Sequence, residues 1–91
     1  MAIYIVTYDL KGESTSDRYN KLIELIKEEG VWACLGRSSY LIESECTAVQ
    51  LRDKYSRVLQ RDDMLFVSVV TAPAAWAGYS QQVTNWIKQK M

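Results

Sequence analysis

The 91-residue chain has no histidine, and its basic and acidic side chains are equal in number, eleven of each. Without imidazole, the usual zinc sites and histidine-based proton relays are excluded. Serine-based hydrolysis lacks its usual base for the same reason. A net charge of zero argues against tight non-specific binding to nucleic acid, which depends on neutralising phosphates, although a local basic patch stays open.

Cysteine is also scarce, and long apolar runs are absent. Cys34 and Cys46 are twelve positions apart, a spacing that fits no metal-binding motif, so we expect a reduced, buried pair of thiols in a cytoplasmic protein. No segment reaches the roughly 18 apolar residues of a membrane span, and the start of the chain does not resemble a signal peptide. With 48% hydrophobic residues, the chain is expected to form one globular domain over residues 1–91, without membrane contact.

The hydrophobic pattern predicts alternating strands and helices. In chain order the elements are a strand at 2–9, a helix of about 15 residues from the capping pair Ser14 and Asp17 to Gly30, strands at 31–35 and 39–43, a helix begun by a Thr47–Gln50 capping box, a strand at 64–70 and a short last helix. This β-α-β-β-α-β order predicts an α+β, ferredoxin-like fold with an antiparallel four-stranded sheet and two helices on one face. The core spans 1–71, and 72–91 form a helical tail.

Alternation along the strands divides their side chains between the two faces of this sheet. We assign to the face that carries the two helices Ile3, Ile5, Thr7, Leu65, Val67 and Val69. To the opposite face we assign Tyr4, Val6, Tyr8, Met64, Phe66 and Trp32. That second face is too apolar for water, and the last strand is an uncharged edge, so we expect a homodimer. Its interface would include Tyr4, Val6, Met64 and Phe66.

Two other uses of the second face stay open. The tail could fold back over the sheet as a lid, with Trp76, Tyr79 and Trp86 against it. Alternatively, Tyr4, Tyr8 and Phe66 could stack on the bases of single-stranded RNA, as aromatic side chains do in RNA-recognition modules of this fold.

The stretch "IYIVTYDL" with Asp9 at its end, a helix closing on Gly30, and a hairpin leading into "RSSYLIES" resemble the CRISPR-associated adaptation subunits, small ferredoxin-like proteins that partner the spacer integrase. The chain is also similar to the virulence-associated protein D group of toxin-like ribonucleases and to SinR-like bacterial and phage proteins. The resemblance is strongest over residues 1–45.

This resemblance implies a homodimer in which Asp9 of each subunit faces its mate and binds Mg²⁺ or Mn²⁺. It implies a metal-dependent endonuclease acting on RNA or DNA, with Asp9 as the catalytic metal ligand. The alternative within the same resemblance is a non-catalytic dimer that binds nucleic acid or another protein in antiviral defence or a toxin–antitoxin system.

The residues themselves leave the role of Asp9 open. Two carboxylates brought together at a dimer axis suit a hard cation, which activates water for attack on a phosphodiester. Aspartate is also common at turns, where its side chain bonds the backbone two residues on. Arg37 at the hairpin turn is either a solvated residue or a phosphate contact, and Tyr8 is its expected partner in binding nucleic acid. Other acids that could join a metal site are Glu13, Asp17, Asp62 and Asp63.

Overall fold

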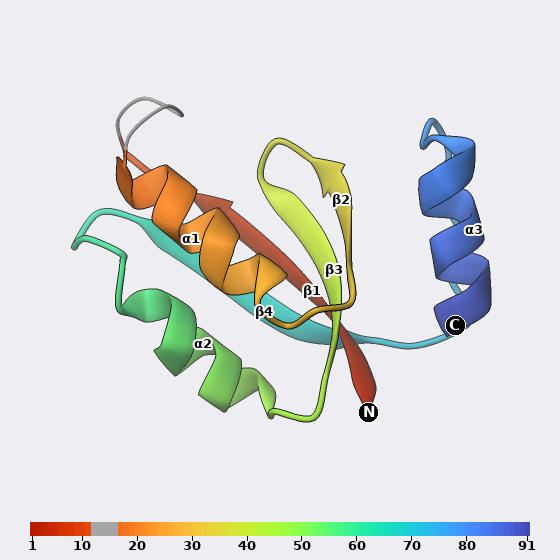
Figure 1. The fold of residues 1–91 in the computed structure, drawn as a ribbon, viewed down its shortest axis with the longest axis horizontal. Helices are drawn as coiled ribbons and strands as arrows, with labels where there is room; N and C mark the ends of the chain where they lie inside the picture. The colour runs from red at the N-terminus through yellow and green to blue at the C-terminus, as the bar shows by residue number, and fades with distance from the viewer. Residues whose placement is uncertain (12–16) are drawn as a thin grey trace.

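The computed structural model describes residues 1–11 and 17–91 (Figure 1). Its elements are β1 (Ala2–Asp9), α1 (Asp17–Lys27), β2 (Trp32–Gly36), β3 (Ser39–Ser44), α2 (Ala48–Ser56), β4 (Met64–Val70) and α3 (Gln81–Lys90). The strands form one antiparallel sheet in the order β2-β3-β1-β4. The predicted ferredoxin-like α+β fold is therefore confirmed. No helix in the described ranges is long and apolar enough to cross a membrane.

Two of the predicted helix boundaries are visible in the backbone. Gly30 has φ of 88°, the left-handed conformation that glycine adopts at low cost after a helix. At the start of α2, the Gln50 amide donates to Thr47 Oγ1 over 3.1 Å, and the Thr47 amide donates to Gln50 Oε1 over 2.8 Å. This reciprocal pair is the predicted capping box. The cap predicted at Ser14 lies outside the described residues.

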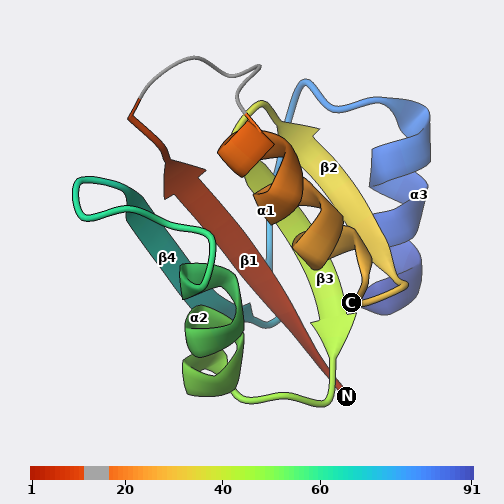
Figure 2. The same cartoon turned by 60° about the vertical axis from the view of Figure 1, so that its left-hand side comes forward.

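Helices α1 and α2 lie side by side on one face of the sheet (Figures 1 and 2). Their apolar side chains pack on that face to form the larger core, whose fully buried members are Val6, Leu22, Ile26, Ile42, Leu51 and Tyr55. Leu65 and Val67 pack against this core, as predicted. Val69 shares the face through its register with Tyr4, but it is 53% exposed on the edge strand.

The predicted facing of β1 is wrong. Tyr4, Val6 and Tyr8 belong to the core beneath α1 and α2, whereas Ile3 and Ile5 point to the other side. Both alternating sets are apolar over most of β1, so periodicity separated them without showing which set the helices cover. In addition, the Tyr4 hydroxyl donates to the Cys46 carbonyl over 2.7 Å. Because this bond satisfies the hydroxyl, Tyr4 can be buried in the core.

Trp32 also lies on the α1 side rather than on the opposite face. Its ring meets Tyr40 edge to face with centroids 5.9 Å apart. The Lys27 ammonium lies 4.6 Å from the centre of the same ring, within cation–π range. Trp32 therefore closes the edge of the larger core.

The opposite face is covered by α3, which Figure 2 shows behind β2 with α1 in front. A second, smaller core forms there from Ile3, Ala33, Leu41 and Ile87, and Trp76 and Trp86 pack around it. The tail therefore covers this face of the sheet, which is the lid arrangement given as one alternative from the sequence. It does not cover the whole face, because Met64 and Phe66 on β4 remain 55% and 61% exposed.

These positions correct the expected dimer interface. Tyr4 and Val6 are 8% and 0% exposed, so neither side chain is available to a second copy of the chain. Met64 and Phe66 are available. The apolar surface left for a partner is therefore a strip along the edge strand, smaller than the bare sheet face expected from the sequence.

Candidate functional site at the end of β1

Asp9 is the last residue of β1 and pairs with Met64, the first residue of β4. Its side chain is exposed and opens on a hollow of about 570 Å³. The residues lining this hollow are Thr7, Tyr8, Asp9, Asp63, Met64, Leu65 and Phe66. Within the described residues, the Asp9 carboxylate makes no hydrogen bond or ion pair. The turn contact considered for Asp9 is not made to Lys11, whose amide donates to Asp63 instead.

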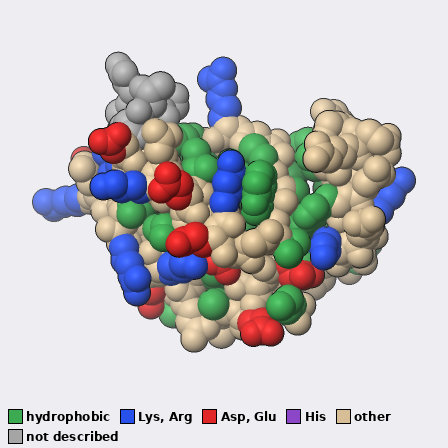
Figure 3. Space-filling view, in the orientation of Figure 1, with side chains coloured by type: hydrophobic (Ala, Val, Ile, Leu, Met, Phe, Trp, Pro, Cys, Tyr) green, Lys and Arg blue, Asp and Glu red, His purple; other side chains and the backbone are tan. Residues whose placement is uncertain are grey.

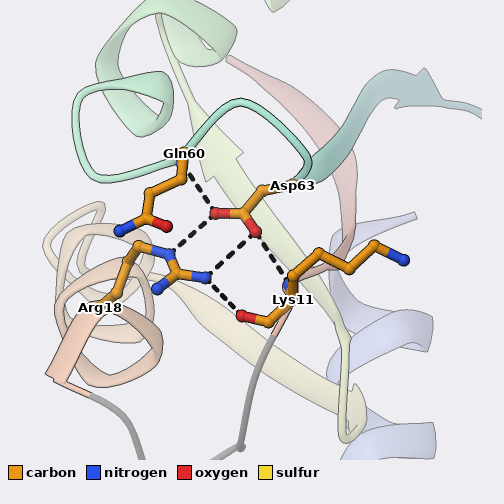
Figure 4. Close-up of polar contacts among 4 residues, drawn as sticks. All are labelled: Lys11, Arg18, Gln60 and Asp63. Carbon is orange, nitrogen blue, oxygen red and sulfur yellow. Dashed lines mark hydrogen bonds and ion pairs between the residues drawn. The ribbon is translucent and has the colours of Figure 1, made fainter.

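Asp63 is the other acid of this hollow, and its environment is very different (Figure 4). Its side chain is fully buried and receives four hydrogen bonds. Arg18 donates from Nε over 2.8 Å and from Nη2 over 3.1 Å. The amides of Lys11 and Gln60 each donate over 2.8 Å.

These bonds stabilise the ionised carboxylate and hold the pKa of Asp63 well below its usual range, with the Arg18 guanidinium as the largest cause. Burial acts in the opposite direction but is outweighed. The same contact raises the pKa of Arg18. Because donors already occupy both oxygens, Asp63 serves as a structural tie between β1, α1 and the segment before β4. This role replaces the metal-ligand role that its position in the sequence left open.

Tyr8 and Arg37, both expected to bind nucleic acid, differ in their exposure to a ligand. Tyr8 is 4% exposed and packs edge to face on Tyr19, with centroids 5.6 Å apart, so it offers no face for a nucleic-acid base. Burial, together with Tyr19, raises the pKa of Tyr8. The hydroxyls of Tyr8 and Tyr19 both donate to the Arg37 carbonyl, over 3.4 and 2.7 Å. The Arg37 side chain is exposed and has no partner among the described residues, so it remains available for a phosphate.

The remaining acids do not complete a metal site within one protomer. Across residues 1–11 and 17–91, no three acids or cysteines gather closely enough to hold a metal ion. Glu13 lies outside the described residues, and Asp17 and Asp62 are exposed. The face seen in Figure 3 carries acidic and basic side chains mixed over α1 and α2, without a broad basic surface. Among the described residues of one protomer, the Asp9 carboxylate is therefore the one group in this hollow that remains available to a cation.

Together, these features define a small ferredoxin-like domain with an exposed carboxylate at the end of its first strand, unpaired among the residues that the structure describes. Comparisons with protein-family models, curated proteins and solved structures found no match for this chain. The class of this domain is therefore defined by its fold and by the exposed Asp9 carboxylate alone.

Proposed function

We propose that the protein is a homodimeric, metal-dependent endonuclease of bacterial or phage origin that acts on RNA or DNA through Asp9. The observation that carries this proposal is the state of the Asp9 carboxylate, which is exposed and unpaired within the described residues. It also lies beside the exposed apolar side chains Met64 and Phe66. The resemblance of the N-terminal strand to CRISPR-associated and toxin-like proteins also supports metal-dependent cleavage through Asp9.

The dimer is needed because one carboxylate is a weak site for a hard cation. Mg²⁺ and Mn²⁺ prefer oxygen ligands, and carboxylate oxygens lie about 2 Å from Mg²⁺. Two Asp9 side chains would therefore have to approach within roughly 5 Å across the dimer axis. Contacts of Met64 and Phe66 with the partner would bring the two hollows together, because both residues line the hollow that holds Asp9.

Each residue then has a distinct task. Asp9 of both protomers would hold the cation, which when bound would supply Lewis-acid activation of water and of the phosphodiester. Arg37, exposed at the β2–β3 turn, contacts a phosphate of the substrate backbone. Asp63 keeps its four hydrogen bonds and holds the end of β1 in place.

Cleavage assays test the catalytic part. Purified protein is incubated with single-stranded RNA and duplex DNA in Mg²⁺, Mn²⁺ or EDTA, and Asp9→Asn is compared with Asp62→Asn, a matched change at a nearby exposed acid. We expect metal-dependent cleavage that Asp9→Asn abolishes and Asp62→Asn preserves, with both variants as stable as the original protein. Absence of cleavage in every metal, or equal cleavage by Asp9→Asn, would contradict the proposal.

Light scattering after size-exclusion chromatography tests the dimer. Phe66→Glu places a charge in the exposed strip, whereas Val49→Glu makes the same change at an apolar residue of α2 that is similarly exposed, 56% against 61%. We expect Phe66→Glu to give monomers and Val49→Glu to leave the dimer intact. A monomeric original protein, or a dimer unaffected by Phe66→Glu, would contradict the interface.

A second candidate is a non-catalytic dimer that binds a protein or nucleic-acid partner in defence or in a toxin–antitoxin system. The exposed apolar side chains of Met64 and Phe66 favour it, because they offer a surface for a partner whether or not Asp9 holds a metal. For this candidate, Phe66→Glu disrupts assembly while Asp9→Asn changes neither assembly nor partner binding. Metal-dependent cleavage lost in Asp9→Asn would exclude it.

A further inference from the structure

Two exposed cations lie next to Asp9 at the end of the sheet, and the first of them is Lys11. Lys11 follows Asp9 by two positions, and both side chains are exposed, whereas Tyr8 and Leu10 belong to the larger core. Because side chains alternate along an extended chain, Lys11 lies on the same side as Asp9, away from α1 and α2.

Arg37 is the second cation at this end. The Tyr8 amide donates to the Ser38 carbonyl over 3.0 Å, which continues the pairing of β1 with β3 past the last strand pair. The turn that carries Arg37 therefore lies beside the end of β1, one strand spacing of about 4.8 Å away. Among the described residues, neither the Lys11 ammonium nor the exposed Arg37 guanidinium forms an ion pair or a hydrogen bond.

The backbone of each cation is held by the first turn of α1. The Lys11 carbonyl accepts a hydrogen bond from Arg18 Nη2, and the Lys11 amide donates to the buried Asp63 carboxylate. The Arg37 carbonyl accepts from the Tyr19 hydroxyl over 2.7 Å. Figure 4 shows the Lys11 side chain pointing away from Arg18 and Asp63. Both cations are therefore exposed on a fixed backbone, which reduces the conformational entropy lost when they bind a ligand.

The placement of these charges indicates the chemistry of the ligand. Arginine and lysine side chains are the usual contacts for phosphate oxygens. A single phosphate held by both cations would also lie close to the Asp9 carboxylate, which would repel it. Successive phosphates of one strand avoid this repulsion, because each can meet one cation on its own side of Asp9.

We propose that Lys11 and Arg37 bind successive phosphates of a nucleic-acid strand that crosses the Asp9 end of the sheet. The proposal rests on the proposed function in one respect, because it takes this end of the molecule as the one that meets nucleic acid. It adds Lys11 to the binding residues. Since each protomer neutralises only two phosphates, the binding is weak and depends strongly on salt, in keeping with a net charge of zero.

Fluorescence anisotropy tests the contacts without cleavage. Labelled single-stranded RNA and DNA of the same sequence, about 12 nucleotides long, are titrated with protein in EDTA at several salt concentrations. Lys11→Gln is compared with Lys88→Gln, a matched change at an exposed lysine of α3. Loss of one contact with a single strand lowers the slope of log affinity against log salt by about 0.7, which is about fivefold in affinity at 0.1 M salt. We expect this loss for Lys11→Gln and no change for Lys88→Gln.

A second pair of variants repeats the test at the other cation. Arg37→Gln should lower the slope by the same amount, and Arg52→Gln, at an exposed arginine of α2, should leave it unchanged. Loss of affinity for only one of the two strands would support the proposal and identify the ligand as RNA or as DNA. No saturable binding of either strand at low salt, or equal slopes for the site variants and their controls, would overturn it.

These outcomes are separate from those of the cleavage assay, because EDTA removes the metal. Binding that Lys11→Gln weakens, in a protein that cleaves nothing in any metal, would support the strand contacts and contradict the endonuclease. Metal-dependent cleavage by a protein whose strand binding is unchanged in Lys11→Gln would support the endonuclease and overturn the strand contacts.

Discussion

Replacing Ile87 by alanine measures how firmly α3 holds the second face of the sheet. Ile87 is the most buried residue of α3, 4% exposed, and it contacts the smaller core over β1, β2 and β3. The change removes three buried carbon atoms, worth about 0.8 kcal/mol each, and so lowers the free energy of unfolding by about 2.4 kcal/mol. That is a large fraction of the roughly 5–15 kcal/mol that stabilises a small domain.

The assay is urea unfolding followed by two signals. Far-ultraviolet circular dichroism reports the whole fold, and tryptophan fluorescence reports strongly on the tail, because Trp76 and Trp86 both lie there. If α3 is part of one cooperative unit, both midpoints fall together. Gln89→Ala, an exposed position on the same helix, is the control and should change stability by less than about 0.5 kcal/mol. A loss below about 1 kcal/mol for Ile87→Ala would refute the view that α3 is firmly packed.

Four further predictions concern buried polar groups. Asp63→Asn should lower the thermal midpoint by several degrees while Asp62→Asn does not, because only Asp63 is tied by four hydrogen bonds. The lowered pKa of Asp63 stabilises the fold above the unfolded-state value of about 4, so this stability should fade in urea unfolding as the pH drops from 5 toward 2, and less so in Asp63→Asn. Tyr55→Phe should change urea-measured stability by less than about 1 kcal/mol, because the buried Tyr55 hydroxyl has no hydrogen-bond partner among the described residues. Burial raises the pKa of Tyr8 and Tyr55, and that of Tyr40 to about 12, so the fold should lose stability as the pH rises above the unfolded-state value of about 10.

Specific results would contradict each of these. Equal thermal midpoints for the two asparagine variants would mean that the Asp63 contacts contribute little. An acid profile unchanged in Asp63→Asn would assign the acid sensitivity to other groups. A loss of 2 kcal/mol or more in Tyr55→Phe would show that the hydroxyl has a partner in solution. Stability that is flat from pH 8 to 12 would contradict the raised tyrosine pKa values.

Much of the fold can be predicted from residues that lie close together in the sequence. The capping box of Thr47 and Gln50, and the left-handed Gly30, each involve residues close in the chain, so their chemistry is readable without any tertiary contact. The apolar strand 2–9 and the uncharged strand 64–70 correspond to β1 and β4 with the same bounds. Element order then limits the topology to a few choices, of which the ferredoxin-like one is observed.

The candidate site was predictable only in part. Asp9 at the end of a strand was visible in the sequence, and the structure leaves it exposed, as a ligand must be. The role of Asp63 was not, because Arg18 is 45 positions away and no local pattern marks two residues that will form a buried ion pair. Tyr8 was misjudged because an aromatic strand residue has the same pattern whether it faces a helix or an open surface.

By itself, the sequence determined the order of elements, some of their ends, such as both ends of β1 and β4, and the division of each strand into two alternating sets. These depend on backbone preferences and on neighbours within a few residues. Only the tertiary structure decided which set the helices cover, that α3 returns across the opposite face, and which acid is held by hydrogen bonds and which is exposed. Those outcomes depend on how distant segments pack, since Ile3 and Tyr4 are both apolar enough for a core and differ only in the surface that each one meets.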